Sequence, residues 1–507
     1  MAGGIAIIDF GSQFTQLIAR RLRQLGVYTE LHPYNVDLEK VRAQAPSGII
    51  FSGGPSSVND DNAPERNVQD FIMIAPVLGI CYGMQLIGKQ FGGVVVKASA
   101  REYGFMEVRW SEPFGNLPEK QKCWMSHGDV IEVPPPGFEI RAKSSNGHIA
   151  AMSGPNIWAV QFHPEVSHTE MGMELLRSFV FDFCKVKTNW VIPNIAQHIL
   201  DDVKKKVSDR EKVLCALSGG VDSTVVAALL TKALGKERVL CLFVDNGLLR
   251  KNEFKEVLEN YKEMNLNVRG IDAKTHFLTE LSGVTDPERK RKIIGKAFID
   301  VFEENIKDAP DIKYLAQGTL YPDVIESVSP RGASVTIKSH HNVGGLPEKM
   351  NLKLIEPLRE LFKDEVRQLG KEIGVKESLL IRHPFPGPGL AVRIIEPITE
   401  EKLNVLRDCD HIFVSELRAK GIYDKIWQAF AVLLPVKTVG VQGDDRSYER
   451  VVCLRAVTSM DGMTADWFEF PANFLRHVSN RITNEVKGVN RVVYDITSKP
   501  PGTIEWE

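Results

Sequence analysis

The sequence predicts an α/β protein of three domains, two built on largely parallel sheets and a smaller C-terminal one of the α+β type. First, a chain of 507 residues is too long for one hydrophobic core. Second, apolar runs of strand length, such as IAIIDFG (Ile5 to Gly11) and VLCAL (Val213 to Leu217), end in glycine-rich turns before helical patterns. Third, RHPFPGPGLAVR (Arg382 to Arg393) marks a boundary. We place the domains at residues 1–186, 192–384 and 385–507.

The composition is that of an ordinary globular protein, with 43% hydrophobic and 25% charged residues. The net charge of −2 gives no general reason to expect nucleic acid or an anionic membrane as partner. The chain has no basic leader and no apolar run near the roughly 18 residues of a membrane span. Its seven cysteines form no CxxC pair, which argues against a disulfide framework or zinc ribbon. We expect a cytoplasmic protein that binds anionic ligands locally.

The first domain places Cys81 between the strand-like run PVLGI (Pro76 to Ile80) and a helical run. A cysteine on such a turn is held in a tight, exposed geometry where the helix N-terminus stabilises its thiolate, which predicts a nucleophile. The alternative is inert packing. WAVQFHPE (Trp158 to Glu165) favours the nucleophile, because Glu165 follows His163 by two residues and can orient its imidazole. A surface His-Pro-Glu turn is the alternative for that segment.

We assign no catalytic or ligand-binding role to two further segments of this domain. GMQLIGKQ (Gly83 to Gln90) has the glycine and lysine spacing of a Walker motif but ends in Gln90 where a magnesium-binding hydroxyl is needed, so we interpret its glycines as helix packing positions. In MSHGD (Met125 to Asp129), His127 is expected to be a structural hydrogen-bonding residue.

The second domain is organised around a loop between VLCAL and the helical run TVVAALLTKAL. Gly219 and Gly220 let an anion approach the main chain at a helix N-terminus, and Asp222 can hold a magnesium ion. The loop lacks the lysine of a Walker A motif, so γ-phosphate transfer is not indicated. A helix N-cap with a glycine turn is the alternative. The hydroxyls that can donate to phosphate are those of Ser218, Ser223 and Thr224.

Later segments add polar groups and helical or strand-like patterns. KLIEPLRELFKDEVRQLG (Lys353 to Gly370) is expected to be an amphipathic helix region, on which Lys363 and Asp364 either line a cleft or lie on a solvated face. In the third domain, KIWQAFAVLLP is expected to be helical, and RVVCLRAVTS and RVVYDIT to be strands. The tail YDITSKPPGTIEWE has two prolines after Lys499 and apolar Ile504 and Trp506 to bury, so we expect it to be docked.

These motifs resemble known families. SGGVDS resembles the pyrophosphatase loop of the N-type ATP pyrophosphatases, which adenylate a substrate oxygen and release pyrophosphate. GICYGMQ, with Cys81, His163 and Glu165, resembles the class I glutamine amidotransferases. FVDNGLLR, DPERKRKIIG, QGTLYPDVIES and KSHHNVGGLP are similar to segments of glutamine-hydrolysing GMP synthetases, and the resemblance runs from about Ile5 to Glu507.

The resemblance implies a class I amidotransferase domain, a doubly wound parallel-sheet ATP pyrophosphatase domain and a small C-terminal α+β domain that forms a homodimer and completes the XMP site. It implies that Cys81 attacks the glutamine amide, that His163 acts as base and then protonates ammonia, and that Glu165 fixes the imidazole. The implied donors of the oxyanion hole are Gly53, Gly54 and Tyr82. The implied ATP contacts are Ser218, Gly219, Gly220, Val221, Asp222, Ser223, Thr224, Val244, Asp245, Asn246, Gln317, Gly318 and Thr319. The implied XMP contacts are Arg291, Gln428, Lys499, Ile504 and Glu505.

The remaining residues implied by the resemblance bind magnesium or interact with the phosphate groups. Asp323 can join Asp222 at magnesium, with a solvated turn as the alternative, and Lys338 and His340 can balance phosphate charge on a lid loop. An Asp-Asn-Gly turn is the alternative for Asp245 and Asn246. Lys499 binds the phosphate of XMP or is a solvated lysine.

Other classes of protein would be expected to have different sequence features. A tRNA-modifying adenylase should add a zinc module, a basic RNA patch or paired thiol-transfer cysteines, and none is visible. An idle regulatory module would be expected to break the triad or the loop. NAD synthetase is the nearest alternative among ligases, but its family uses a different amidotransferase type and lacks this C-terminal segment.

Overall fold

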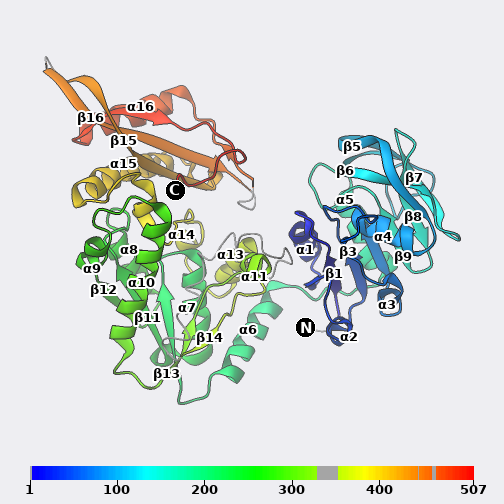
Figure 1. Cartoon of the computed structure of the whole chain (residues 1–507). Helices are drawn as coiled ribbons and strands as arrows, with labels where there is room; N and C mark the ends of the chain where they lie inside the picture. Colours follow the sequence, from blue (N-terminus) through cyan, green and yellow to red (C-terminus); the bar gives the residue numbers. More distant parts are fainter. Residues whose placement is uncertain (1–2, 328–351, 443–444, 460–463) are drawn as a thin grey trace. The chain divides into compact units, whose positions relative to one another are not determined.

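The computed structural model describes residues 3–327, 352–442, 445–459 and 464–507 (Figure 1). It divides into two compact units. The first comprises Met1–Ile195 and Pro322–Ile337, and the second comprises Ala196–Tyr321 and Lys338–Glu507. The finer division into three domains stays a prediction.

A mixed sheet forms the centre of the first unit. In spatial order its strands are β2 (Thr29–Pro33), β1 (Ile5–Asp9), β3 (Gly48–Phe51), β4 (Val77–Ile80), β9 (Ile157–Val160), β8 (Ile149–Gly154), β7 (Glu139–Ser144), β5 (Val94–Trp110) and β6 (Lys120–Val133). The strands from β2 to β9 run parallel, and β1, β3, β4 and β9 are almost fully buried, as their continuous apolar runs predict, whereas β2 at the edge of the sheet is only partly buried. From β9 to β6 the sheet is antiparallel, which the prediction of a mostly parallel sheet missed. The reason is that β6 alternates exposed and buried residues instead of forming an apolar run.

The helices of this unit connect the parallel strands and cover the sheet. They are α1 (Thr15–Gln24), α2 (Leu38–Gln44), α3 (Val68–Ile72), α4 (Tyr82–Gln90), α5 (Gly172–Arg177) and the π-helical segment η1 (Ser178–Phe183). The helical pattern that follows IAIIDFG (Ile5 to Gly11) is confirmed as α1. The interpretation of GMQLIGKQ as a packed helix is also confirmed, because a Cβ at Gly88 would lie 2.7 Å from the side chain of Ile131.

The second unit contains the doubly wound parallel sheet that the sequence predicts. Its order is β12 (Val268–Asp272), β11 (Val239–Asp245), β10 (Lys212–Leu217), β13 (Ile312–Ala316) and β14 (Lys353–Ile355), all parallel. The chain order reverses between β10 and β13, and ligands of such sheets bind at that switch point. The helices along this stretch of the chain are α6 (Ile192–Lys206), α7 (Val221–Leu234), η2 (Lys236–Arg238), α8 (Glu253–Glu263), α9 (Lys274–Glu280), α10 (Pro287–Ile306), α11 (Tyr321–Ser327), α13 (Lys363–Glu372) and α14 (Glu377–Leu380). Of these, α6 up to Ile195 and α11 from Pro322 belong to the first unit.

One expectation about this stretch is wrong. Lys353 to Gly370 is not one amphipathic helix, because its first residues form β14 and the helix α13 begins only at Lys363. Pro357 separates the two elements, since proline disfavours a helical conformation in the residue before it.

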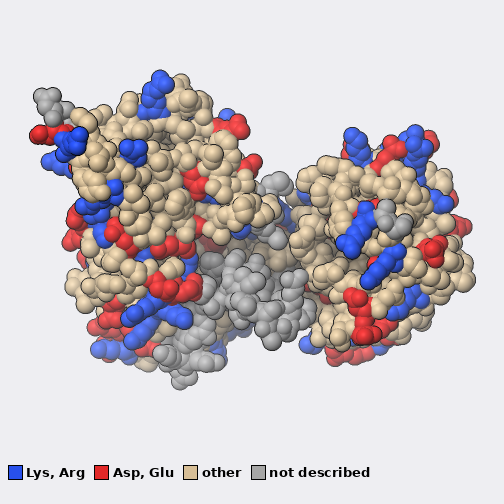
Figure 2. All heavy atoms as spheres, turned by 45° about the horizontal axis from the view of Figure 1, so that its top comes forward, with Lys and Arg blue, Asp and Glu red and all other residues tan. Residues whose placement is uncertain are grey.

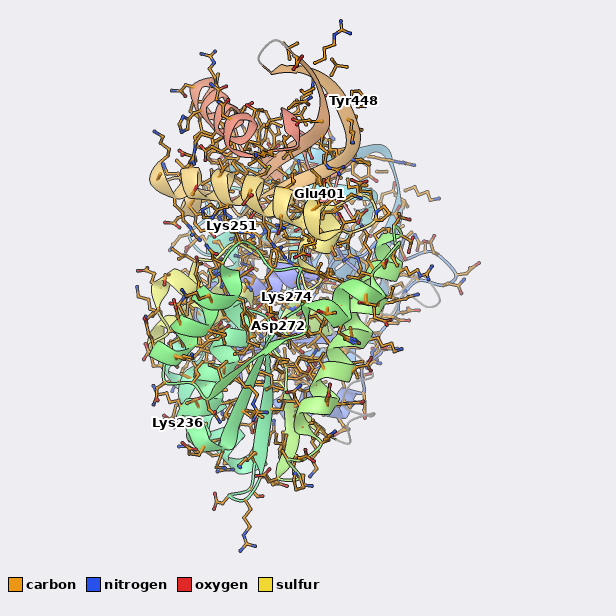
Figure 3. The ribbon with its side chains drawn as sticks, turned by 90° about the vertical axis from the view of Figure 1, so that its left-hand side faces the viewer. Lys236, Lys251, Asp272, Lys274, Glu401 and Tyr448 are labelled. Carbon is orange, nitrogen blue, oxygen red and sulfur yellow. The ribbon has the colours of Figure 1, made fainter. Side chains whose placement is uncertain are left out.

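The C-terminal part packs helices on a twisted sheet. Its strands are β15 (Gln428–Gln442), β16 (Asp445–Thr458), β17 (Asp466–Trp467) and β18 (Val489–Tyr494), and its helices are η3 (Gly389–Arg393), α15 (Glu400–Ala419), η4 (Tyr423–Lys425) and α16 (Ala472–Glu485). Figures 1 and 3 show α15 lying along the long ribbon of β15 and β16. The predicted α+β character is therefore confirmed.

The helix expected in KIWQAFAVLLP is wrong, because its residues from Gln428 onward form β15. Phe430 and Val432 face one cluster with Cys453, whereas Ala429 and Ala431 face the main core. A strand that is buried on both faces shows no alternation, so its pattern cannot be distinguished from that of a buried helix.

The crossing segment after Pro388 is buried inside this unit. Leu390, Ala391 and Ile394 share one core with Leu214 and Leu242 of the parallel sheet. Close packing requires glycine at position 389, where φ is +61° and a Cβ would lie 2.5 Å from the carbonyl oxygen of Leu248. The sheet and the C-terminal part are therefore joined by one hydrophobic core.

Candidate functional site

Cys81 lies on the turn between β4 and α4, with φ of +52°, a conformation that residues other than glycine rarely adopt. The turn is close-packed, because a Cβ at Gly83 would lie 2.6 Å from the carbonyl oxygen of Phe51. Such a strained strand-to-helix turn is typical of a nucleophile. The expected exposure is wrong. Cys81 is only 4% exposed, and its thiol donates at 3.8 Å to the carbonyl of Ser126 on β6.

His163 and Glu165 follow β9 in a turn and form the predicted pair, with Nδ1 2.7 Å from Oε1. Both are buried, which excludes a surface turn. Burial opposes protonation of the imidazole, but the Glu165 carboxylate and the hydrogen bond to Cys81 outweigh it and raise the pKa of His163 to about 10. An imidazolium is the cation that stabilises a cysteine thiolate.

Burial dominates the titration of three other thiols. Burial raises the pKa of Cys123, Cys184 and Cys453 to about 12 each. These cysteines are therefore unreactive packing residues.

Two residues that the sequence analysis missed support the pair. Thr169 Oγ1 donates to the carbonyl of His163 at 2.6 Å and accepts from the Trp124 amide at 3.0 Å. Arg21 Nε donates to the carbonyl of Glu165 at 2.9 Å. Neither residue belongs to a recognisable motif, so no sequence signal could have found them.

The three predicted oxyanion donors surround the same turn. A Cβ at Gly53 would lie 3.0 Å from His163 Cε1 and 3.6 Å from Cys81 Cβ, so Gly53 lies against both side chains. A Cβ at Gly54 would lie 3.3 Å from the ring of Tyr82. Tyr82 begins α4, and an amide at that position has no partner within the helix. Their role as donors stays a prediction.

His127 is structural, as expected. It is buried, with Nδ1 3.0 Å from the carbonyl of Asp129 and Nε2 3.0 Å from Oε2 of Glu102.

The loop Ser218–Gly220 follows β10 and leads directly into α7 at the switch point of the second sheet. Gly219 has φ of +76°, which favours glycine at this position. Ser218 Oγ lies 3.1 Å from Ser223 Oγ, so both hydroxyls are held at the mouth of the loop. Thr224 is different. It is 1% exposed, and its hydroxyl contacts the Gly220 carbonyl and the Tyr261 hydroxyl, so its side chain has less support as a phosphate donor.

Asp222 lies in the first turn of α7 and forms an ion pair with Lys363 at the start of α13. Of the two alternatives for Lys363, the structure therefore supports a place beside the loop at Ser218 rather than on a fully solvated face. Oδ1 of Asp222 is buried and has no hydrogen-bond partner among the described residues. An acidic oxygen without a partner fits a magnesium ligand.

The ends of β11 and β13 flank the loop. A Cβ at Gly318 would lie 3.2 Å from Cβ of Asp222, so the turn after β13 touches α7. Thr319 Oγ1 donates to Glu356 at 2.6 Å, and the Gln317 amide donates to the Ile355 carbonyl at 3.0 Å.

At the end of β11, Val244 and Asn246 are buried, and Asp245 pairs with Lys274 at 3.1 Å. Lys274 also lies 3.7 Å from Asp272, beside it in Figure 3. Lys274 is a neighbour of the expected adenosine site that the sequence analysis missed.

Two groups of predicted residues stay untested. Asp323 lies in the first turn of α11, and its sharing of magnesium with Asp222 stays a prediction. Lys338 and His340 lie outside the described residues.

The C-terminal tail is docked, as expected. Lys290 Nζ lies 2.7 Å from Oε2 of Glu507, and Arg291 donates to the Glu507 carbonyl at 2.6 Å. Gln428 Nε2 donates to Oε1 of Glu505 at 2.6 Å. The main chain of Lys499 pairs with that of Ala465.

The two apolar tail residues differ in burial. Ile504 packs partly buried beside Phe430 and Val432. Trp506 stays 39% exposed, which corrects the expectation that it is buried. Four of the five predicted XMP contacts, Arg291, Gln428, Ile504 and Glu505, therefore lie in or against the last residues of the tail, whereas Lys499 lies nearer its start.

The surface carries charges of both signs. On the face shown in Figure 2, acidic and basic side chains are intermingled over the described residues. None of the helices in the described part of the chain is both long enough and apolar enough to cross a membrane.

Three family models match the chain in succession. The class I glutamine amidotransferase model matches residues 6–183, the NAD synthase model matches residues 191–307, and the GMP synthase C-terminal domain model matches residues 415–506. Together with the site geometry, these matches define an ATP-dependent amidotransferase ligase. NAD synthetase, the alternative among ligases, is represented only by the middle segment.

Full-length relatives narrow that class. Glutamine-hydrolysing GMP synthases of Bdellovibrio bacteriovorus, Nitratidesulfovibrio vulgaris and Chlorobaculum tepidum are 61%, 54% and 53% identical to this chain. Each comparison covers 99% of this chain and at least 99% of the relative. The chain belongs to the glutamine-hydrolysing GMP synthase family.

Proposed function

We propose that this chain converts XMP, ATP, glutamine and water into GMP, AMP, pyrophosphate and glutamate. One observation carries the proposal. The Cys81–His163–Glu165 arrangement and a phosphate-type loop at Ser218 occur in one chain that also matches the GMP synthase C-terminal domain. The first can release ammonia from glutamine, and the second can activate the oxygen that ammonia replaces.

In the first reaction, His163 takes the proton of the Cys81 thiol, and the sulfur attacks the amide carbon of glutamine. The strained turn at Cys81 and the buried His163–Glu165 pair support these roles. Donors at Gly53, Gly54 and Tyr82 stabilise the oxyanion. The imidazolium then donates its proton to the departing ammonia, and water hydrolyses the thioester to glutamate.

In the second reaction, the 2-oxygen of xanthine attacks the α-phosphorus of ATP and pyrophosphate leaves. Adenylation is needed because that oxygen is otherwise a poor leaving group. The amides of Ser218–Ser223 and the hydroxyls of Ser218 and Ser223 hold the pyrophosphate, and Val244, Asp245 and Gln317–Thr319 contact the adenosine. Ammonia then displaces AMP, and holding both reactants in one site supplies a large effective molarity.

We also propose the groups that complete this site. Asp222 and Asp323 hold magnesium, which neutralises phosphate charge when bound, and the partnerless Oδ1 of Asp222 supports this. Lys338 and His340 act from a lid. XMP is held by Arg291, Gln428, Lys499, Ile504 and Glu505, and the gathering of four of them at the docked tail supports that set.

We further propose a cytoplasmic homodimer, formed through the C-terminal domain, with no nucleic-acid or membrane partner. Val439, Val441 and Tyr448 on the β15–β16 ribbon are more than half exposed, and Figure 3 shows Tyr448 on this ribbon. Exposed apolar groups of this kind support a contact with a second copy. Light scattering of the purified chain measures the mass.

One assay tests the central proposal. The chain is incubated with XMP, ATP and glutamine, and every product is identified by chromatography and mass spectrometry. We expect GMP, AMP, pyrophosphate and glutamate in equal amounts. ADP and phosphate, or no GMP at all, would contradict the proposal.

A further inference from the structure

Three basic side chains that are fully buried hold the C-terminal tail. Lys290 of α10 contacts the carboxylate of Glu507, and Arg455 of β16 donates to the carbonyls of Thr497, Thr503 and Ile504. Arg393, in η3, contacts the carboxylate of Glu505 instead. Arg393 is thus the one of the three that contacts a side chain of the proposed XMP site.

The contact between Arg393 and Glu505 is a bidentate ion pair. Nε of Arg393 lies 3.1 Å from Oε2, and Nη2 lies 2.9 Å from Oε1. The guanidinium is 0% exposed and lies over the ring of Phe430, with its carbon 4.1 Å from the ring centre. This geometry fixes the plane of the carboxylate, because a guanidinium fork matches both oxygens at once.

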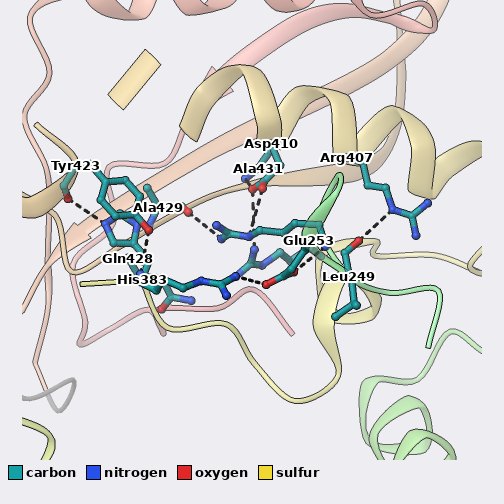
Figure 4. A network of polar contacts seen from close by, with 12 residues as sticks. Leu249, Glu253, His383, Arg407, Asp410, Tyr423, Gln428, Ala429 and Ala431 are labelled. Atoms are coloured by element: carbon teal, nitrogen blue, oxygen red, sulfur yellow. Dashed lines mark hydrogen bonds and ion pairs between the residues drawn. The ribbon is translucent and has the colours of Figure 1, made fainter. Parts of the chain in front are cut away.

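The other neighbours of Arg393 do not compete with Glu505 for its Nε and Nη2 donors. Asp410 lies 4.0 Å from Nη1, too far for a hydrogen bond, and its own oxygens accept from the Ala431 amide at 3.2 Å and face Arg250 Nε at 3.4 Å. Figure 4 shows Asp410 next to Ala431 in this network. Asp410 therefore balances the buried charge of Arg393 without competing for its donors.

The row of charges continues toward the phosphate loop. Glu253 accepts from the Arg250 amide at 3.0 Å and pairs with Arg382, and Arg382 donates to the Gly219 carbonyl at 2.9 Å. Glu253 and Gln428 appear on either side of the network in Figure 4. Acidic and basic groups thus alternate from Gly219 to Glu505, so each buried charge has a neighbour of opposite sign.

We propose that Arg393 is a positioning residue for the purine base of the nucleotide, acting through Glu505. Glu505 lies in the irregular segment that follows β18, where a glutamate would otherwise sample several rotamers. Held by Arg393 and Gln428, its carboxylate still has lone pairs left to accept N–H groups from the edge of a purine. Preordering it in this way removes the cost of ordering it when the nucleotide binds. The inference rests on the proposed function, since it assumes that XMP is the substrate.

The test compares Arg393→Lys with Arg455→Lys. Both replace a fully buried arginine that holds the tail, but only the first touches the Glu505 side chain. Steady-state rates are measured with an ammonium salt as nitrogen source, so the glutaminase plays no part. We expect Arg393→Lys to raise the KM for XMP about 10- to 100-fold and to change the KM for ATP less than about threefold. Arg455→Lys should raise the two constants together or neither.

A double-mutant cycle with Glu505→Gln decides whether Arg393 acts through Glu505. If it does, Arg393→Lys should raise the KM for XMP less than about threefold further in the Glu505→Gln background. Full additivity of the two effects, or equal rises for XMP and ATP in Arg393→Lys, would overturn the inference. Circular dichroism confirms that each variant is folded, and Arg393→Gln replaces Arg393→Lys if the lysine variant does not fold. Failure of the unmodified chain to use XMP would instead refute the proposed function.

Discussion

Glu165→Gln tests the charge that the structure places behind the catalytic imidazole. The substitution keeps the size of the side chain and removes its charge 2.7 Å from Nδ1 of His163, in a buried site. An opposite charge at such a distance shifts a pKa by about 1 to 3 units, and each unit is worth about 1.4 kcal/mol. The pKa of His163, which the carboxylate of Glu165 helps to raise to about 10, should therefore fall in the variant.

The sign of the pH effect follows from the proton that His163 must carry. The imidazolium stabilises the thiolate and protonates ammonia, so glutaminase activity is lost as the pH rises through the pKa of His163. In Glu165→Gln this alkaline limb should move to lower pH, and the rate at the optimum should fall about 10²- to 10⁴-fold. The measurement is glutamate release from pH 6 to pH 10, with ammonium-dependent GMP formation in the same preparation as a folding control.

A matched variant separates this effect from general damage. Glu102→Gln also removes a buried carboxylate that faces a histidine, His127, in the same unit, but the pair does not include a triad residue. It should leave the alkaline limb of glutamate release where it is. An unmoved limb in Glu165→Gln, or an equal shift in both variants, would refute the reasoning.

The remaining predictions concern one reaction or ligand each. Cys81→Ala should abolish glutamine-dependent synthesis and retain ammonium-dependent synthesis, since the thiol is needed only to make ammonia; equal loss with both nitrogen sources would count against the assignment. Asp222→Asn should strongly reduce pyrophosphate release while circular dichroism stays unchanged, because it removes a charged oxygen without changing the size of the side chain; near-normal release would exclude Asp222 as a metal ligand. Lys499→Ala should raise the KM for XMP roughly 10- to 150-fold and leave that for ATP nearly unchanged, as expected for loss of a charge-assisted phosphate contact; an unchanged XMP constant would make Lys499 a solvated side chain.

The sequence predicted best where function depends on neighbours along the chain. Cys81 on its strand-to-helix turn, the pair His163 and Glu165, and the loop at Ser218 are local patterns, and the structure has each in the expected place. The parallel sheets were predictable for the same reason, because their strands are continuous apolar runs.

What could not be predicted depends on contacts between distant parts of the chain. Lys363 meets Asp222 across 141 residues, and Arg393 meets Glu505 across 112. No local pattern marks Arg393 as buried in a site, and for Lys363 the sequence alone could not decide between a cleft and a solvated face. The strand β15 could not be predicted either, because it is buried on both faces and its sequence lacks the alternation of apolar and polar residues that identifies a strand.

The most direct test of the account is the fate of the amide nitrogen of glutamine. The chain is supplied with XMP, ATP and glutamine labelled with ¹⁵N in the amide, and the products are analysed by mass spectrometry. We expect the label in the 2-amino group of GMP, with one AMP formed for each GMP. Unlabelled GMP, label found only in free ammonia, or ADP in place of AMP would contradict the claim that this chain joins glutamine hydrolysis to adenylation of XMP.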